Sequence, residues 1–295
     1  MPSFRPAATF PSCLGIRRHP RYSPGRVEAD TRILLRTAEE LGRRGYTVEI
    51  RDETELDDDV PARVIFTMAQ SLRGIRRLRA LQRQGRVVVN SPESIQNCRR
   101  NRMIPLLRAA GVPLPASWFV DLRSGRGFDS VLAGDGAQTR QVGFPRAGRL
   151  WVKRGDVHAT DPSDVVAVDN ERDLEAVLEQ FRRRGLYRVL LQAHVPGSLV
   201  KFYAVRGTPF FFEYFPDPQT LRPIDSATLQ YWATRAAEVL GLDVYGGDAV
   251  VTPDGSVVII DVNDWPSFEP CVEEAVPFIV DRILQRARAA GAIEL

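Results

Sequence analysis

The chain has 295 residues, of which 44% are apolar and 26% charged, an ordinary globular composition with enough length for two domains. Its net charge of +3 arises from 40 basic and 37 acidic residues scattered along the chain, so no basic run marks a nucleic-acid or membrane surface. The three cysteines, Cys13, Cys98 and Cys271, are an odd number at wide, irregular spacings without a CxxC motif, which argues against a disulfide framework or a structural zinc site. No apolar run approaches the roughly 20 residues of a membrane helix, so we expect a cytoplasmic protein.

The first 95 residues alternate between short apolar runs and segments with helical periodicity. We expect strands at 10–16, 46–51, 62–67 and 87–90, and helices at 27–44 and 71–84. Strands that alternate with helices imply a parallel sheet. The sequence therefore predicts a small α/β domain over residues 1–95.

The remainder, residues 96–295, predicts a second domain of mixed α+β character. It begins with a helix at 95–110 that is kinked or divided at Pro105. Residues 123–148 are rich in Gly, Ser, Arg and Gln and indicate a loop or an irregular hairpin. We expect strands at 118–122, 150–153, 189–193, 199–205, 210–214, 248–252 and 256–262, and helices at 171–184, 227–240 and 272–290.

A hairpin near the C-terminus gathers oxygen-bearing side chains. In GGDAVVTPDGSVVIIDVNDWPSF, Asp248 begins one strand, while Asp261 and Asn263 end its partner and share a face because strand side chains alternate. Two carboxylates and an amide form a hard-ligand set suited to Mg²⁺ or Mn²⁺. The alternative is that they cap a hairpin; against it, Asp261 stands inside an apolar run, where a charge must be paired or metal-bound.

Lysine is rare in this chain. Only Lys153 and Lys201 stand among the 40 basic residues. Where any positive charge suffices the sequence uses arginine, so these two positions are candidates for a compact ammonium, as in a crowded phosphate site. The alternative is that the genome favours arginine and that these two lysines remain by chance.

The order of these residues resembles the ATP-grasp superfamily over about residues 90–290. The resemblance rests on Lys153 in a strand, LLQAHVPG as an interdomain hinge, Lys201 in VKFYAV, Asp248, and IDVN followed by a proline. Two branches are similar at once: the ribosomal-protein glutamate ligases, which share an LGLDV-G-D segment, and the inositol trisphosphate kinases, which carry a segment similar to VKFYAV. The resemblance implies an ATP-grasp fold of two α+β subdomains over residues 96–295, preceded by an α/β pre-ATP-grasp domain over residues 1–95.

The resemblance also implies a nucleotide site. Lys153 would contact the α- and β-phosphates of ATP, and Gln192, Ala193, His194 and Val195 would line the adenine hinge. A strand can present backbone N–H and C=O groups to the adenine edge, between apolar walls. An ordinary buried strand is the alternative for this segment.

Other roles carried over concern the transferred phosphate. Lys201 would face this phosphate or the acceptor, and Arg102, or Arg100 beside it, matches a basic position that touches nucleotide, although an exposed helix face is the alternative. The segment RGDVHAT departs from the glycine-rich loop of many ATP-grasp ligases, because it has one glycine. We therefore expect His158 and Thr160 to contribute side-chain contacts; a solvated loop residue is the alternative for His158.

Two groups of residues are candidates for the acceptor site. One follows the metal strand and the other follows the first strand, where open α/β sheets place ligands. They are Trp265, Ser267 and Phe268, and Arg17, Arg18 and His19. The alternative for Trp265 is a place in the hydrophobic core. The alternative for Arg17, Arg18 and His19 is that they are simply solvated loop residues.

These observations predict an ATP- and Mg²⁺-dependent enzyme. The leading interpretation is a carboxylate-amine ligase that acts through an acyl phosphate on a small-molecule or peptide acceptor. The second is a kinase that phosphorylates a polyol phosphate, and the third is a nucleotide-binding protein without catalysis. Fold resemblance by itself does not decide the substrate.

Overall fold

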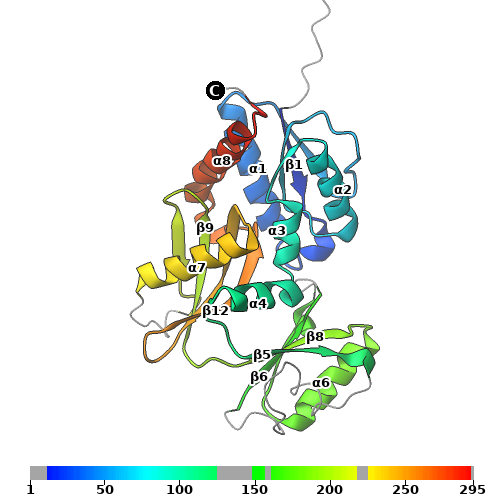
Figure 1. Ribbon diagram of the computed structural model, residues 1–295, viewed down its shortest axis with the longest axis vertical. Helices are drawn as coiled ribbons and strands as arrows, with labels where there is room; N and C mark the ends of the chain where they lie inside the picture. Colours follow the sequence, from blue (N-terminus) through cyan, green and yellow to red (C-terminus); the bar gives the residue numbers. More distant parts are fainter. Residues whose placement is uncertain (1–11, 125–147, 157–160, 218–224, 294–295) are drawn as a thin grey trace, which may run out of the picture.

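The computed structural model describes residues 12–124, 148–156, 161–217 and 225–293. Within these ranges the chain forms three four-stranded sheets that follow one another along the long axis of the molecule (Figure 1). Their strand orders are β2-β1-β3-β4, β10-β9-β11-β12 and β5-β8-β6-β7. No helix in the described ranges is long and apolar enough to cross a membrane.

The N-terminal sheet is parallel throughout, as the sequence predicts. Helices between its strands carry one apolar face each, and Ser71 caps its helix by accepting from the N–H of Gly74. Its elements are β1 (Cys13–Arg17), α1 (Val27–Arg43), β2 (Val48–Asp52), β3 (Val64–Thr67), α2 (Leu72–Arg83) and β4 (Val87–Val89).

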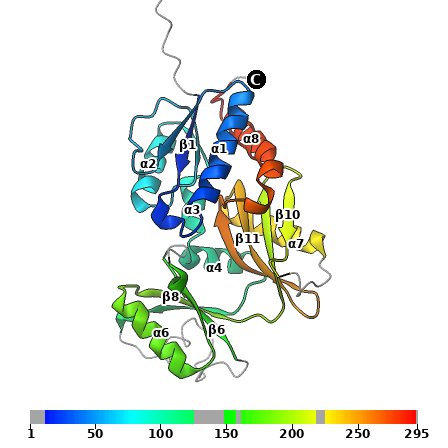
Figure 2. The ribbon, with the colours of Figure 1, turned by 180° about the vertical axis from the view of Figure 1, so that it is seen from behind.

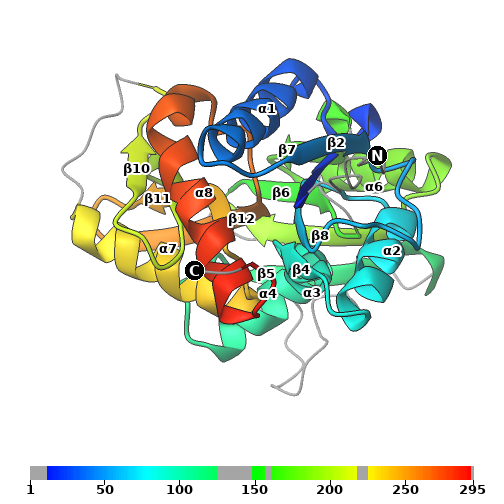
Figure 3. The same cartoon turned by 90° about the horizontal axis from the view of Figure 1, so that it is seen from above.

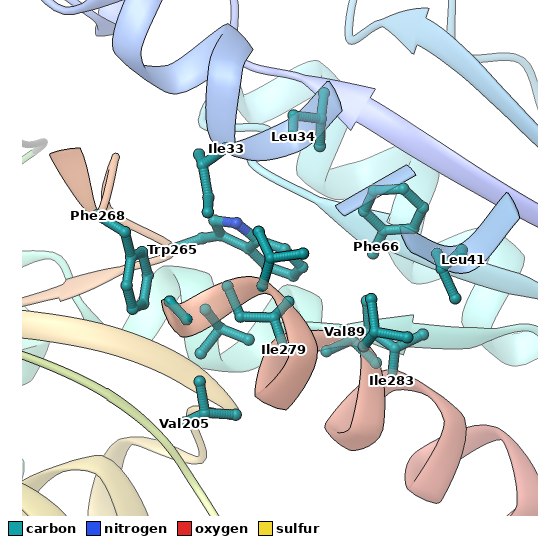
Figure 4. Packing of buried hydrophobic residues seen from close by; sticks show 14 of the residues in the cluster. Ile33, Leu34, Leu41, Phe66, Val89, Val205, Trp265, Phe268, Ile279 and Ile283 are labelled. Atoms are coloured by element: carbon teal, nitrogen blue, oxygen red, sulfur yellow. The ribbon is translucent and has the colours of Figure 1, made fainter. Parts of the chain in front are cut away.

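The last helix, α8 (Val272–Ala289), returns to this sheet and packs beside α1 (Figure 2). Figure 4 shows the shared apolar cluster, in which Ile33 of α1 and Ile279 of α8 lie near Trp265, and Phe66 of β3 packs at 6.0 Å from its ring. The core beside the N-terminal sheet is therefore completed by α8, from the other end of the sequence.

The middle sheet is antiparallel and carries the predicted metal hairpin. Helix α7 packs against it, and α4 lies beside α7 (Figure 1). The elements are β9 (Ser198–Val205), β10 (Phe211–Tyr214), α7 (Ser226–Leu240), β11 (Val244–Val251) and β12 (Val257–Asp264).

The third sheet is smaller, and α6 covers one of its faces (Figure 2). Its elements are β5 (Ser117–Asp121), β6 (Leu150–Arg154), β7 (Val165–Val168), α6 (Glu171–Arg183) and β8 (Arg188–Ala193). Strand β7 was not predicted. Seen from above, this sheet lies beneath the other two (Figure 3).

The expectation of one helix, kinked or divided at Pro105, is wrong. The chain forms two helices, α3 (Pro92–Asn97) and α4 (Arg100–Ala109), and Pro105 lies inside the second. The break falls at Arg99, whose backbone is extended (φ −67°, ψ 131°) and precedes the first turn of α4. The predicted helix is therefore divided before Arg100 and not at the proline.

Strand β11 also begins earlier than predicted, at Val244 and not at Asp248. This part of the strand was missed because it contains Gly246 and Gly247, and glycine has no side chain to contribute to the apolar pattern by which a strand is predicted. Both are required by crowding, since a Cβ at Gly247 would lie 2.3 Å from the main-chain oxygen of the facing strand.

Candidate functional site

Two cavities meet at the middle sheet. The first, which we name the hinge cavity, has a volume of about 380 Å³ and lies between the third and middle sheets. It is lined by Trp151, Lys153, Val165, Gln192, Ala193, His194, Val195, Gly197, Leu199, Asp248, Val250 and Ile260. All four residues predicted for the adenine hinge, and Lys153, therefore face one cavity.

The second, which we name the N-terminal cavity, has a volume of about 290 Å³ and lies between the N-terminal and middle sheets. It is lined by Arg18, Tyr22, Ser23, Pro24, Arg26, Asp30, Gln70, Lys201, Tyr203, Tyr214, Gly247, Asp248, Asn263, Asp264, Pro266 and Ser267. Asp248 lines both cavities, so the two spaces adjoin at this residue.

The predicted metal ligands come together at this boundary. In the β11–β12 hairpin Asp248 lies directly opposite Asp261, and Asn263 follows two residues later on the same face. Elsewhere in the described ranges, as here, no group of three or more His, Cys, Asp or Glu side chains is placed to hold a metal ion. A metal at this hairpin would therefore need the Asn263 amide and ligands from a bound molecule.

The two carboxylates predicted as metal ligands already have cationic partners. Lys201 Nζ lies 2.6 Å from Asp248 Oδ1, and Arg100 Nη2 lies 2.7 Å from Asp261 Oδ2. Arg100 is buried at the start of α4 and also donates to the carbonyl of Arg154 at 3.0 Å. The oxygen donors fit Mg²⁺, which is commonly held by one or two carboxylates together with substrate phosphates.

Lys153 and Gln192 lie on the neighbouring strands β6 and β8, and both side chains are buried. Lys153 Nζ donates to Gln192 Oε1 at 2.5 Å. Burial is the main influence on this lysine and lowers its pKa to about 8. The ammonium is thus held inside the hinge cavity at a cost in desolvation.

Two backbone N–H groups of the predicted hinge already donate hydrogen bonds within the protein. The N–H of Ala193 donates to Ala116 O at 2.8 Å, and the N–H of His194 donates to Arg149 O at 3.0 Å. Val195 follows the end of β8, and its N–H has no backbone partner within the described ranges. Of the predicted hinge donors, Val195 is the one placed to serve a ligand.

Arg102 does not line either cavity. It is exposed and donates to Gln96 Oε1 at 3.2 Å, while Arg100, two residues earlier, turns inward to Asp261. Of the two arginines weighed from the sequence, Arg100 is therefore the one at the site. The proposed contributors His158 and Thr160 lie outside the described residues.

The basic residues at the end of β1, Arg17, Arg18 and His19, make hydrogen bonds and ion pairs within the protein. Arg17 pairs with Asp52 at 2.9 Å, and the Nδ1 atom of His19 accepts from the N–H of Arg21 at 3.2 Å. Arg18 lines the N-terminal cavity, but its guanidinium donates to Asp30 at 2.9 Å and to the main-chain oxygens of Met68, Asp264 and Trp265.

The residues after β12 divide between the core and the cavity. Trp265 and Phe268 are fully buried in the cluster around α8, so Trp265 is a core residue and not a substrate platform. Both have a positive φ, 39° and 52°, which turns the chain sharply after the metal strand. Ser267, between them, lines the N-terminal cavity.

Several lining residues were not predicted. Tyr203 and Tyr214 form stacked rings on neighbouring strands, with centroids 6.3 Å apart. Gln70, before α2, donates to both carboxylate oxygens of Asp264 at 2.8 Å. The contact of Gln70 could not be predicted, because it joins segments 194 residues apart. The two tyrosines lie on strands that were predicted, at 199–205 and 210–214, but nothing in their spacing showed that they line a cavity.

The fold resembles solved structures of ATP-grasp proteins. A RimK domain ATP-grasp protein from Sphaerobacter thermophilus is 18% identical, with a TM-score of 0.69 over 92% of this chain and 99% of that chain. D-alanyl-alanine synthetase A from Vibrio cholerae is 12% identical, with a TM-score of 0.68 over 95% and 99% of the two chains. The D-alanine–D-alanine ligase from Bacillus anthracis, complexed with ATP, is 14% identical, with a TM-score of 0.68 over 95% and 98%.

No family model and no curated protein matches the sequence. At these identities the likeness establishes the fold and nothing finer. The expected α/β (α+β) architecture is confirmed: the chain has the ATP-grasp fold, with a parallel sheet at its N-terminus.

Proposed function

We propose that this chain, which has the ATP-grasp fold, is an ATP- and Mg²⁺-dependent carboxylate-amine ligase that acts through an acyl phosphate. The observation that carries the proposal is that Asp248 lines both cavities. A nucleotide in the hinge cavity would have its terminal phosphate at the metal hairpin, where the N-terminal cavity begins. The acceptor would occupy that second cavity.

The hinge cavity suits ATP in its walls and in its charge. The adenine edge would meet the N–H of Val195, which has no backbone partner in the described ranges, between Trp151 of β6 and Ile260 of β12. The phosphates would extend towards Lys153, the cation in this cavity. A cavity of about 380 Å³ is within the usual range for a small-molecule site, about 300–1,000 Å³.

Asp248, Asp261 and Asn263 would hold Mg²⁺ together with phosphate oxygens. Such an ion neutralises the charge that develops on a transferred phosphoryl group. The partners that now occupy the two carboxylates, Lys201 and Arg100, would remain beside the phosphates as fixed positive charges.

The proposed chemistry balances in two steps. A carboxylate oxygen of the acceptor attacks the γ-phosphorus of ATP, the bond from that phosphorus to the bridging oxygen breaks, and ADP leaves. The nitrogen of the amine then attacks the acyl carbon and loses a proton, and phosphate leaves with the electrons of the C–O bond. The protein positions the groups and balances their charge, so no nucleophilic side chain is needed.

The charges that line the N-terminal cavity do not favour a polyol-phosphate acceptor. Such a ligand would require several uncommitted cations. Within the described ranges each basic lining residue has a carboxylate partner: the pairs are Arg18–Asp30, Arg26–Glu269 and Lys201–Asp248. An acceptor with few negative charges fits this cavity better, which favours the ligase over the kinase.

Trapping the intermediate tests the proposal. We expect ATP, Mg²⁺ and a pool of carboxylic acids with hydroxylamine to yield ADP, phosphate and a hydroxamate, because hydroxylamine captures an acyl phosphate. With amines in place of hydroxylamine, ADP and phosphate should form in equal amounts with an amide. A stable phosphorylated product without free phosphate would instead establish a kinase.

A matched pair of variants controls for damage to the hairpin. Asp261→Asn removes a proposed metal ligand, and we expect at least a hundredfold loss of turnover, about 2.7 kcal/mol of transition-state stabilisation. Asp254→Asn makes the same change at the exposed tip of the same hairpin and should leave turnover unchanged. Equal losses in both variants would contradict the assignment of Asp261.

A further inference from the structure

The ammonium of Lys153 has a neutral partner. Its residue is 6% exposed, and Nζ donates to the amide oxygen of Gln192 at 2.5 Å. Within the described ranges it makes no ion pair. An ammonium can donate three hydrogen bonds, so this lysine retains donors for a ligand.

Three poorly exposed arginines in the described part of the chain behave differently. Each of three arginines with side chains at most 12% exposed contacts a carboxylate directly: the pairs are Arg18–Asp30, Arg100–Asp261 and Arg282–Asp243, at 2.9, 2.7 and 2.6 Å. Burying a charge is costly unless it is paired. The exception at Lys153 therefore indicates a charge held for an anion that comes from outside the protein.

The orientation of Gln192 is fixed by a short chain of hydrogen bonds. Ser117 Oγ donates its one proton to Pro115 O at 2.8 Å, so towards Gln192 it can only accept. Gln192 accordingly gives its Nε2 to Ser117 at 3.4 Å and turns its Oε1 to Lys153. With Gln192 at 1% exposure, this arrangement leaves the amide no alternative rotation without loss of a bond.

The charged groups around Lys153 come from three other elements. Burial lowers its pKa to about 8, Asp261 on β12 and Asp248 on β11 act to raise it, and Arg100 on α4 acts to lower it. None of these three forms an ion pair with Lys153 in the described ranges. Gln192 is thus its direct contact, and a charge at position 192 would dominate its protonation.

On the basis of the proposed function, we propose that Gln192 is a positioning residue that holds the Lys153 ammonium towards the nucleotide phosphates without neutralising it. The amide supplies a hydrogen-bond acceptor, as a carboxylate would, but no charge. The nucleotide then becomes the anion that compensates the lysine. Binding therefore stabilises the protonated form, and above pH 8 a proton enters together with the nucleotide.

Calorimetry with a non-hydrolysable ATP analogue, AMP-PNP, and Mg²⁺ measures this without turnover. Between pH 7 and 9.5 we expect Kd of the natural chain to rise towards about tenfold per pH unit above pH 8 if only the protonated lysine binds. At pH 8 about half a proton should be taken up per nucleotide. Buffers with different ionisation enthalpies reveal the uptake as a change in observed heat.

Two substitutions at position 192 move this profile in opposite directions. Gln192→Glu adds a charge beside Lys153, so the rise in Kd should shift upward by at least one pH unit, the proton uptake at pH 8 should vanish, and Kd at pH 7 should weaken several-fold. Gln192→Leu removes the acceptor and should shift the rise downward. Gln180→Glu, the same change on the exposed face of α6, should leave the profile as it was.

The outcomes are distinguishable. If the natural chain binds AMP-PNP and neither variant at position 192 moves the pH profile, Gln192 is a purely structural residue and the inference fails while the proposed function stands. Thermal unfolding of each variant confirms that it is folded. If the natural chain binds no AMP-PNP at any pH, both the inference and the proposed function are overturned.

Discussion

Replacing Arg18 with methionine tests whether this arginine serves the fold or a ligand. Its guanidinium is 12% exposed and donates to Asp30, whose side chain is 5% exposed. It also donates to main-chain oxygens of Met68 and Trp265, at 3.2 and 2.9 Å. Arg18 thereby joins the end of β1 to the segments that follow β3 and β12.

The expected loss follows from this burial. Removing one partner of a buried ion pair leaves an uncompensated charge and costs about 3–5 kcal/mol. Arg17→Met is the matched control, because its pair with Asp52 is 34% and 46% exposed and should be worth less than about 1 kcal/mol. With an m-value of about 3 kcal/mol/M, Arg18→Met should lower the urea midpoint by roughly 1–1.7 M.

A double variant checks the cause of the loss. Arg18→Met combined with Asp30→Asn removes the stranded carboxylate as well, so it should recover part of the stability lost in Arg18→Met alone. Equal, small losses in Arg17→Met and Arg18→Met would refute the reasoning. So would an Arg18→Met protein of unchanged stability with weakened acceptor binding, because that result would make Arg18 a ligand-binding residue.

Three further changes test other contacts. Asp243 is 1% exposed and accepts from Arg206 and Arg282 at 2.9 and 2.6 Å. Asp243→Asn should therefore lower the free energy of unfolding, measured in urea, by about 3–5 kcal/mol. The control Asp281→Asn, at an exposed ion pair, should lower it by about 1 kcal/mol or less. Asn90→Ala removes three buried hydrogen bonds of 2.7–2.9 Å to the backbone that opens β11, and the same assay should show a loss of about 2–4 kcal/mol. Gly247→Ala places a Cβ 2.3 Å from a main-chain oxygen in the metal hairpin, so calorimetry should show at least tenfold weaker Mg²⁺-dependent nucleotide binding, whereas Gly42→Ala, with no atom within 4 Å, should not.

The order of secondary structure could be predicted where local periodicity and punctuation agree. Strands of the parallel N-terminal sheet are short apolar runs between segments of helical periodicity. The β9–β10 and β11–β12 hairpins are apolar strands joined at turn residues. The break before α4 could not be predicted. Pro105 is the obvious local signal, but the helix is interrupted at Arg99, where α4 instead begins against the end of β6: the N–H of Asn101 donates to Gly155 O at 3.1 Å.

Local spacing also brought together the metal-ligand candidates, because hairpin pairing is short-range and fixes which side chains share a face. Lys153 could be singled out by composition, since it is one of two lysines in an arginine-rich chain. In contrast, the sequence could not choose between Arg100 and Arg102. That choice depends on which side of α4 faces the hairpin, and both residues belong to the same first turn.

Sequence alone thus predicted most of the helices and strands, the hairpin of candidate metal ligands and the two lysines, because each depends on residues close together in the chain or on composition. Tertiary structure alone showed that Asp248 borders both cavities, that Arg18 donates to the main-chain oxygen of Trp265, and that Lys153 donates to Gln192. These contacts join segments that are far apart in the sequence, so no local periodicity predicts them. The physical reason is burial. A charge needs a partner only once folding has removed water from around it, so the sequence alone does not show which charges are paired within the protein and which remain for a ligand.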